Sequence, residues 1–132
     1  MTSLFERVQA WIDDDPDEVT QAQAAEVLAD AQAGDTGAQQ QLEVWFGPML
    51  QFGTAGLRGP IAPGPACMNR AVVMRAAQGL INYLQARGLR SIAVGYDARH
   101  RSIDFALDTV SLAAAAGLDA KLMPRTLPTP VL

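Results

Sequence analysis

The sequence has little of what marks secreted, membrane-spanning or nucleic-acid-binding proteins. Its single cysteine, Cys67, has no partner for an internal disulfide bond. No apolar run approaches the roughly 18 residues of a membrane span, and the N-terminus is acidic and polar where a signal peptide is basic and then apolar. Aromatic residues make up only 6% of the chain and its basic residues form no dense cluster, which disfavours nucleic-acid binding. We therefore expect a cytoplasmic protein that binds neither nucleic acid nor a membrane.

Charge is distributed unevenly along the chain. Residues 1–44 carry ten acidic side chains and one basic side chain, a net charge of −9. Residues 45–132 carry the other four acids and nine bases, a net charge of +5. Because positive charge attracts anions, we expect an anionic ligand to bind the second part of the chain. The acidic first part is expected to be a solvated surface.

A length of 132 residues and an apolar content of 49% are sufficient for one domain with a buried core. In the first part of the chain, apolar residues recur at helical spacing. They predict helices over residues 3–13 and 17–33, and a third helix that Asp35 caps and that ends near Phe46. The apolar stripe expected on the second helix consists of Val19, Ala22, Val27, Leu28 and Ala31.

Glycine and proline are frequent between Gly47 and Pro65, which predicts a loop there. A long helix is predicted over residues 69–87, because apolar residues form one helical face that includes Leu80. The change in character after residue 46 suggests a helical extension over 1–46 that precedes a separate domain.

The last part of the chain predicts a βαβ unit. Apolar runs over residues 92–96 and 120–123 are typical of strands, and the residues between them predict a helix over 103–116 with Ser102 as its N-cap. Strands joined by such a crossover are parallel, so the expected fold class is α/β. The helix is apolar nearly all round, which predicts burial between the sheet and another layer.

A glycine-rich stretch, FGTAGLRG, begins at residue 52. Gly53 and Gly56 let the backbone approach a ligand closely. The Thr54 hydroxyl can donate a hydrogen bond, and the Arg58 guanidinium can bind two phosphate oxygens at once. A glycine-rich turn with an arginine is also a common structural loop, so these residues alone leave a phosphate site and a structural loop both open.

A second polar stretch follows the first predicted strand, where open α/β sheets bind ligands. It contains Asp97, Arg99 and Ser102. These side chains could contact a ligand, or Asp97 and Arg99 could form an ion pair that holds the turn. The nearby His100 is expected on the surface, and Cys67 is expected to be a packed thiol rather than a nucleophile.

Several motifs in a fixed order give the chain a resemblance to a known family. They are FGTAGLRG from residue 52, MNR from residue 68, QG from residue 78, GYDARHRS from residue 95 and PTP from residue 128. Together these resemble the α-D-phosphohexomutases, which include phosphoglucomutases, phosphomannomutases and phosphopentomutases. The helical extension, with Trp11 and an Asp-Asp-Pro sequence at residues 14–16, is similar to that of one branch of the family.

The resemblance implies a fold and an activity. The fold would be a three-layer α/β/α domain with a mixed sheet, over residues 47–132, the first of four domains. The enzyme would interconvert hexose 1-phosphate and hexose 6-phosphate through a phosphoserine and a bisphosphorylated sugar. It would need Mg²⁺ and a bisphosphorylated hexose activator, and its partners would be the phosphosugar substrate and the enzyme's other domains.

The family's catalytic serine lies in a Ser-His-Asn-Pro type of loop, which this sequence does not contain. We therefore expect the chain to stop before that serine, to hold no metal ligands and to be inactive alone. Carried over from the family, Arg58 would stabilise the transferring phosphoryl group, and Thr54 and Arg58 would bind substrate. The structural residues at the site would be Gly53, Gly56, Asp97, Arg99 and Ser102.

Two other classes of function are weighed against an enzyme. The first is a non-catalytic α/β module that binds a phosphate ligand or a partner protein. The second is an unrelated nucleotide-binding domain, which is disfavoured because neither a G-x-G-x-x-G motif nor a P-loop follows a predicted strand. The sequence does not decide which sugar is used or how many copies of the chain associate.

Overall fold

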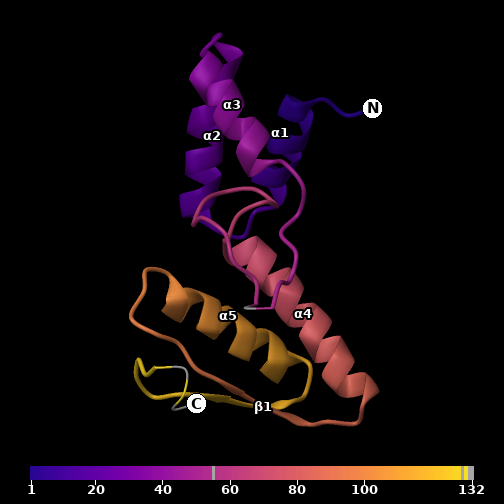
Figure 1. Ribbon diagram of the computed structural model, residues 1–132. Helices are drawn as coiled ribbons and strands as arrows, with labels where there is room; N and C mark the ends of the chain where they lie inside the picture. Colours follow the sequence, from indigo (N-terminus) through magenta and orange to yellow (C-terminus); the bar gives the residue numbers. More distant parts are fainter. Residues whose placement is uncertain (55, 129, 131–132) are drawn as a thin grey trace. The chain divides into compact units, whose positions relative to one another are not determined.

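The computed structural model describes residues 1–54, 56–128 and 130, which form helices and a small parallel sheet (Figure 1). The chain divides into two compact units, Met1–Val72 and Val73–Leu132. The first unit is helical and the second contains both strands and helices. The α/β class expected from the sequence is therefore confirmed.

The first unit begins with three helices, α1 (Leu4–Asp14), α2 (Glu18–Gln32) and α3 (Thr36–Trp45). Each starts at a side chain that accepts a hydrogen bond from a backbone N–H of the first turn. These caps are Ser3, Asp17 and Asp35, and Ser3 forms a reciprocal pair of bonds with Glu6. Such caps satisfy donors that have no partner within the helix. The three helices predicted from the sequence are thus confirmed to within a residue or two.

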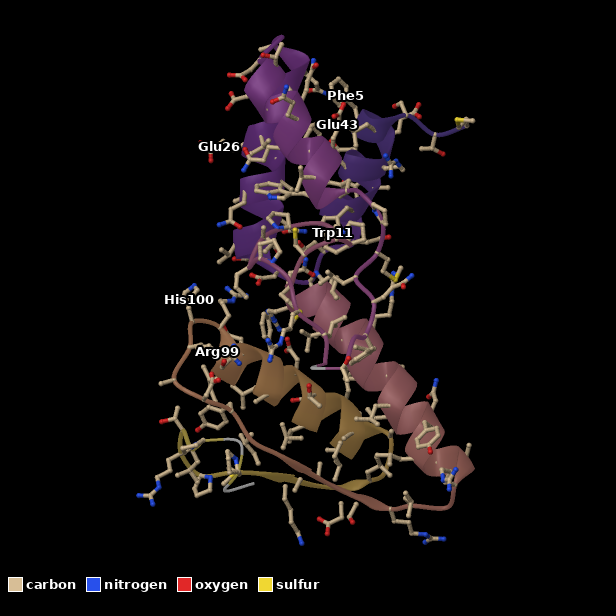
Figure 2. All side chains as sticks on the ribbon, viewed as in Figure 1. Phe5, Trp11, Glu26, Glu43, Arg99 and His100 are labelled. Atoms are coloured by element: carbon tan, nitrogen blue, oxygen red, sulfur yellow. The ribbon has the colours of Figure 1, made fainter. Side chains whose placement is uncertain are left out.

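The core of this unit lies between the three helices. Trp11 packs edge-on against Phe46, with ring centroids 5.9 Å apart, and its indole N–H donates to the Asp15 carboxylate. Glu26 and Glu43 are exposed on the outside of α2 and α3 (Figure 2). The acidic side chains there are consistent with the expected solvated surface. The buried core residues are Val8, Leu28, Ala31, Ala38, Leu42 and Phe46.

The predicted apolar stripe of α2 is wrong at its N-terminal end. Val19 is 52% exposed and Ala22 is exposed, whereas Thr20 and Ala24 are buried. The reason is the start of the helix: the Thr20 hydroxyl donates to the buried Asp15 carboxylate, which turns Thr20 inward and Val19 outward. A specific hydrogen bond therefore outweighs the burial of one valine.

The loop between α3 and the next helix packs closely against the end of α3. Gly64 has a φ of +98°, and a Cβ there would lie 2.2 Å from the Trp45 carbonyl oxygen. The Asn69 side chain is buried, and its Nδ2 donates to the carbonyl oxygens of Ala62 and Gly64 at 2.9 and 2.8 Å. Its Oδ1 accepts from the Val72 amide at 2.9 Å. One side chain thus holds the loop and caps the helix that follows.

The second unit is the predicted parallel βαβ unit. Strands β1 (Ser91–Val94) and β2 (Asp119–Leu122) pair in parallel, and α5 (Ser102–Ala115) connects them. Gly95 and Tyr96, predicted to end the first strand, follow β1 instead. The backbone contact continues there without a strand, because the Leu127 N–H donates to the Tyr96 carbonyl at 3.1 Å.

Helix α5 packs along the β1–β2 pair (Figure 1). Helix α4 (Arg70–Ala86), of which residues from Val73 onward belong to this unit, contributes the Ile81 and Leu84 side chains to the same apolar cluster. The buried cluster consists of Ile81, Ala113 and Leu118, with Leu84, Ile92, Leu112, Ala116 and Ala120 packed against it. The strand residues that alternate with these, Ser91, Ala93, Asp119 and Lys121, are exposed. None of the described helices is long and apolar enough to cross a membrane.

Two expectations of burial in this unit are wrong. Helix α5 is not covered all round, because Ile103 and Leu107 are 39% and 47% exposed. On α4, Leu80 is 46% exposed although it was expected on the buried face. The sheet in the described residues has two strands, so each helix finds enough apolar partners for only part of its surface.

We predict that Asn69→Ala destabilises the protein, because it removes the side-chain bonds to the Ala62 and Gly64 carbonyls and a helix cap. The loss in free energy of unfolding should be about 2–3 kcal/mol, measured by urea denaturation of the whole chain. Asn82→Ala is the matched control: Asn82 lies exposed on α4, and among the described residues its side chain bonds Gln78 alone, so the loss should stay within about 0.5 kcal/mol. Equal effects of both substitutions would contradict the role of Asn69.

Candidate functional site

The glycine-rich stretch forms a tight turn in the first unit. The Gly53 N–H donates to the Gly56 carbonyl at 3.0 Å, and the Gly56 N–H donates back at 3.1 Å. Gly56 has a φ of +97°, a conformation that other residues rarely adopt. The two glycines therefore close the turn, in which Thr54 lies.

The side chains expected to bind phosphate are presented to solvent. Thr54 and Arg58 are both exposed, and so is Phe52, at 71%. Near them, Gly59 packs closely against the Leu50 side chain, and the Leu50 N–H bonds the Pro65 carbonyl at 3.0 Å. The loop thus combines an anchored base with exposed donor groups, which is the arrangement a ligand-binding loop needs.

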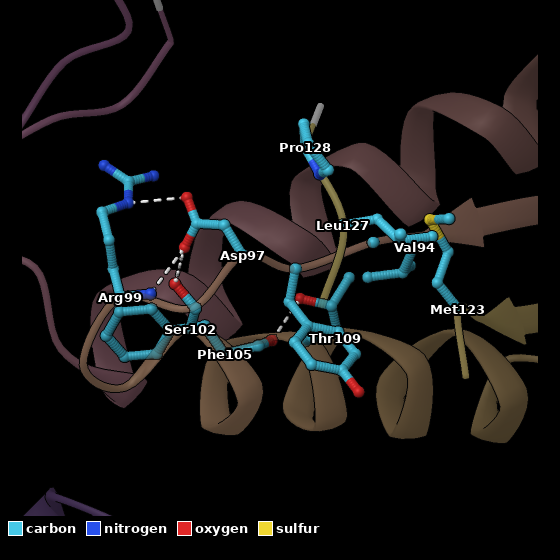
Figure 3. Close-up of a pocket in the computed structure, with 12 residues that line it drawn as sticks. Val94, Asp97, Arg99, Ser102, Phe105, Thr109, Met123, Leu127 and Pro128 are labelled. Atoms are coloured by element: carbon cyan, nitrogen blue, oxygen red, sulfur yellow. Dashed lines mark hydrogen bonds and ion pairs between the residues drawn. The ribbon is translucent and has the colours of Figure 1, made fainter. Parts of the chain in front are cut away.

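The second polar stretch is organised around the Asp97 carboxylate, in the turn between β1 and α5 (Figure 3). Its Oδ1 accepts from the Arg99 backbone N–H at 3.1 Å and from the Ser102 hydroxyl at 2.7 Å. Its Oδ2 accepts from the Arg99 Nε at 2.7 Å. The structure therefore brings Asp97, Arg99 and Ser102 together, and they form the ion pair that the sequence analysis considered.

Ser102 is not the N-cap that the sequence predicted. The capping position is Arg101, which has a φ of 71° and makes no side-chain capping bond, and Ser102 is the first residue of α5. The prediction fails because the Ser102 hydroxyl bonds Asp97, five residues earlier, instead of an N–H of its own helix. Arg101 instead pairs with Asp104 at 3.1 Å.

The hydrogen bonds to Asp97 change its acidity. The pKa of the Asp97 carboxyl lies below its ordinary value, chiefly because the Ser102 hydroxyl donates to the carboxylate and secondly because the Arg99 backbone N–H does. Both bonds stabilise the charged form. Asp97 therefore favours folding above the ordinary aspartate pKa of about 3.9, and this contribution is lost as the pH falls through the lower pKa of the folded state.

A cavity of about 310 Å³ opens beside this turn. It lies at the carboxyl end of β1, where open α/β sheets commonly bind ligands. Asp97, Arg99 and Ser102 lie at one end of it, and Val94, Met123 and Leu127 lie toward the other (Figure 3). The cavity thus offers both polar and apolar surface. The remaining lining residues are Gly95, Tyr96, Phe105, Ala106, Thr109 and Pro128.

Thr109, Met123 and Leu127 also line this cavity, although no motif in the sequence pointed to them. They lie on α5 and after β2, separate from the motif that contains Asp97. The predicted parallel βαβ unit indicated that a ligand site could lie at the carboxyl end of the first strand. Which side chains meet there depends on the path of the chain after β2, for which the sequence gave no pattern.

Two chemically versatile residues lie where they were expected. Cys67 is fully buried, and burial raises the pKa of its thiol, so it is a packed thiol with little thiolate character. His100 is exposed in the turn before α5 (Figure 2). Within the part of the chain that the structure describes, no three carboxylate, histidine or cysteine side chains come together as a possible metal site.

The described residues thus form an α/β protein with a parallel βαβ unit, a cavity at the carboxyl end of β1, and a glycine-closed turn followed by an exposed arginine. The family model for phosphoglucomutase/phosphomannomutase, alpha/beta/alpha domain I, matches residues 49–132. The chain therefore belongs to this phosphohexomutase family, and the matched residues are its N-terminal domain I. The motifs that suggested the family from the sequence are thus confirmed in that role.

Curated relatives agree with the family. The chain is 52% identical over 66 residues to a probable phosphomannomutase of Haemophilus influenzae. The matched segment covers 49% of this chain and 14% of that protein. It is 30% identical over 132 residues to a probable phosphoribomutase of Schizosaccharomyces pombe, covering 97% of this chain and 22% of the relative. A phosphoglucomutase of Staphylococcus haemolyticus is 38% identical over 81 residues, covering 61% and 15%.

The chain thus spans less than a quarter of the length of each of these relatives. No solved structure gives a significant match.

We predict that Ser102→Ala raises the pKa of Asp97 toward its ordinary value, because the substitution removes the bond that lowers the pKa most. The carboxyl resonance of Asp97, followed by NMR while the pH is lowered, measures this directly. Ser111→Ala is the control, since Ser111 is exposed on the same helix and should leave the titration unchanged. An unchanged Asp97 titration in Ser102→Ala would show that the Ser102 bond does not form.

Proposed function

We propose that this chain is the N-terminal part of a phosphoglucomutase/phosphomannomutase that interconverts hexose 1-phosphate and hexose 6-phosphate. The reaction would pass through a phosphoserine and a bisphosphorylated sugar. The observation that carries the proposal is the family match over residues 49–132, which includes the exposed loop of Thr54 and Arg58. The curated relatives are named as phosphomutases, which supports the same class of reaction.

Arg58 is proposed to stabilise the transferring phosphoryl group. A guanidinium has a planar fork of donors that matches two phosphate oxygens, and its charge offsets the negative charge that the phosphoryl group carries during transfer. The Thr54 hydroxyl would donate a further bond to the substrate. The bonds between Gly53 and Gly56 would hold the turn so that little ordering is needed when the ligand binds.

Asp97, Arg99 and Ser102 are proposed as structural residues at the site, where their bonds fix the turn after β1. A four-domain protein is proposed, with residues 1–46 as a helical extension and 47–132 as a three-layer domain with a mixed sheet. The start of the family match at residue 49 supports this boundary. We also propose that the protein is cytoplasmic.

The proposed reaction needs Mg²⁺ and a bisphosphorylated hexose activator. The described residues bring together no set of three or more acidic, histidine or cysteine side chains, so they do not fit a magnesium site. In the proposal the ion is held elsewhere in the full-length enzyme. The names of the relatives include phosphomannomutase, phosphoribomutase and phosphoglucomutase, so substrate tests should include phosphates of glucose, mannose and ribose.

The alternative function is a non-catalytic module that binds a phosphate ligand or a partner. Both functions need the phosphate contacts, and only the enzyme needs a nucleophile. The sequence contains no Ser-His-Asn-Pro loop. Activity of the full-length protein therefore separates the two, because the module would bind a phosphosugar and release it unchanged.

In the full-length enzyme, Arg58→Lys is expected to lower turnover by about a hundredfold, because an ammonium cannot reproduce the two-pronged contact with a phosphoryl group. Steady-state mutase kinetics measure the change. Arg87→Lys is a suitable control, because Arg87 stacks on Tyr83 on α4 and lies far along the chain from the glycine-rich loop. Turnover of Arg58→Lys within about twofold of the unmodified enzyme would make FGTAGLRG a structural loop.

The purified chain of residues 1–132 is expected to have no mutase activity toward glucose or mannose phosphates, with or without Mg²⁺ and bisphosphate activator. Without the serine no covalent phosphoenzyme forms. A coupled mutase assay and transfer of labelled phosphate from a bisphosphorylated sugar are the two measurements, with the full-length enzyme as positive control. Mutase turnover or stable phosphate label that co-purifies with the chain would contradict this expectation. It would require a different nucleophile, to be sought among Thr54, Ser102 and Ser111.

A further inference from the structure

Arg99 is held in a way that a brace for its turn does not require. The turn is already closed by the two bonds to the Asp97 Oδ1, one from the Arg99 backbone N–H and one from the Ser102 hydroxyl. The additional bond, from Arg99 Nε to Asp97 Oδ2 at 2.7 Å, restrains the guanidinium itself. An exposed ion pair adds little to folding stability, so the main effect of this bond is to restrain the guanidinium.

The restrained guanidinium keeps its terminal nitrogens free for another group. The Arg99 side chain is 86% exposed, and among the described residues its two Nη atoms have no partner. An arginine fixed through Nε presents one N–H from each Nη in parallel, which matches two oxygens of one anion. Because Asp97 holds the fork in place, an anion that binds it loses less side-chain entropy than it would at a freely rotating arginine.

Arg99 is one of the residues that line the 310 Å³ cavity. Its guanidinium lies beside the Asp97 carboxylate, at the opposite end from Val94, Met123 and Leu127 (Figure 3). The apolar remainder of the cavity, which includes Val94 and Phe105, can accept the body of a small ligand. An anion on Arg99 therefore would not be an isolated surface ion. It would be the charged end of a molecule that extends into the cavity.

We infer that Arg99 binds the phosphate group of a small phosphorylated ligand whose body occupies this cavity. The choice of phosphate rests on the proposed function, whereas the presence of a two-oxygen anion site rests on the geometry of Arg99 alone. The site differs from the Arg58 loop, which belongs to the first compact unit. It also gives Arg99 a ligand contact beyond the structural role proposed above.

The Asp97 charge sets the strength expected of this site. Asp97 is the acidic residue among the lining residues and Arg99 is the basic one, so the pair together carries no net charge. The carboxylate is engaged by three donors, which reduces its repulsion of a second anion. Binding should therefore depend on the directed fork, and affinities should be on the order of millimolar.

The experiment is an NMR titration of the whole chain, with the Arg99 Nε–Hε group and the amides of residues 97–102 as reporters. Inorganic phosphate, glucose 6-phosphate, acetate and uncharged glucose are added separately at constant ionic strength. Saturable shifts with inorganic phosphate and glucose 6-phosphate, stronger for the sugar phosphate, are expected. Equal affinity for acetate would overturn the phosphate assignment, and equal affinity for glucose would overturn the role of the charge.

Three variants separate a directed contact from simple charge. Arg99→Gln should weaken phosphate binding by at least about fivefold, and Arg99→Lys by about threefold, since lysine keeps the charge without the fork. Arg90→Gln removes the same charge from an exposed arginine at the opposite end of β1 and should change affinity by less than about twofold. Equal weakening by Arg90→Gln, or none by Arg99→Gln, would overturn the inference. Melting curves of each variant confirm that it is folded.

The outcome is independent of catalysis, because binding is measured on residues 1–132 without turnover. Arg58→Lys in the same chain should leave the shifts of residues 97–102 in place. If Arg99 binds phosphate and the full-length protein proves inactive, the inference stands and the proposed function fails. If the full-length protein is active and Arg99→Gln leaves phosphate binding unchanged, the proposed function stands and the inference about Arg99 fails.

Discussion

The loop between α3 and α4 depends on one buried amide, the Asn69 side chain. Proline has no backbone donor, and the described residues of this loop are joined by scattered backbone bonds and isolated bridges instead of a strand ladder. A side-chain donor therefore adds bonds that the backbone does not make. Asn69 supplies such bonds to Ala62 and Gly64 and at the same time accepts from Val72. This side chain thus adds to the backbone bonds of the loop, such as those between Ala62 and Met68 and between Met68 and Pro60, and it connects the end of the loop to the start of α4.

The turn after β1 follows the same principle with a charged acceptor. Asp97 gathers the Arg99 N–H and the Ser102 hydroxyl, which fixes the backbone without using the terminal nitrogens of Arg99. In the first unit, Gly53 and Gly56 close their own turn and leave Arg58 exposed. In both places the backbone is held by groups other than the exposed arginine side chain. A guanidinium that the fold does not consume is free to contact a ligand, which is what precise binding on a loop requires.

Signals within a few residues were the ones that could be read from the sequence. Ser3, Asp17 and Asp35 begin helices because each bonds a donor in its own first turn. Ser102 looked the same in sequence, but its hydroxyl bonds the Asp97 carboxylate, five residues earlier, instead of an N–H of its own helix. Val19 is exposed because its neighbour Thr20 bonds Asp15, and Leu107 is exposed because the two-stranded sheet covers only part of α5. Periodicity shows that a helix has an apolar face, whereas the neighbouring elements decide how much of that face is covered.

The candidate site divides along the same line. Thr54 and Arg58 could be found from a contiguous motif and from its resemblance to a family, although their roles remain predictions. The cavity beside Asp97 could not be predicted in detail, because Thr109 and Leu127 reach it from separate segments.

The two exposed arginines, Arg58 and Arg99, would contribute to one reaction in different ways. An arginine that contacts phosphate equally in the substrate and in the transition state affects KM, whereas one whose contact strengthens during transfer affects kcat. If Arg58 acts on the transferring phosphoryl group and Arg99 only holds a ligand, substitutions at the two positions should separate into these two kinetic classes. A binding module, which has no transition state to stabilise, could show only the first.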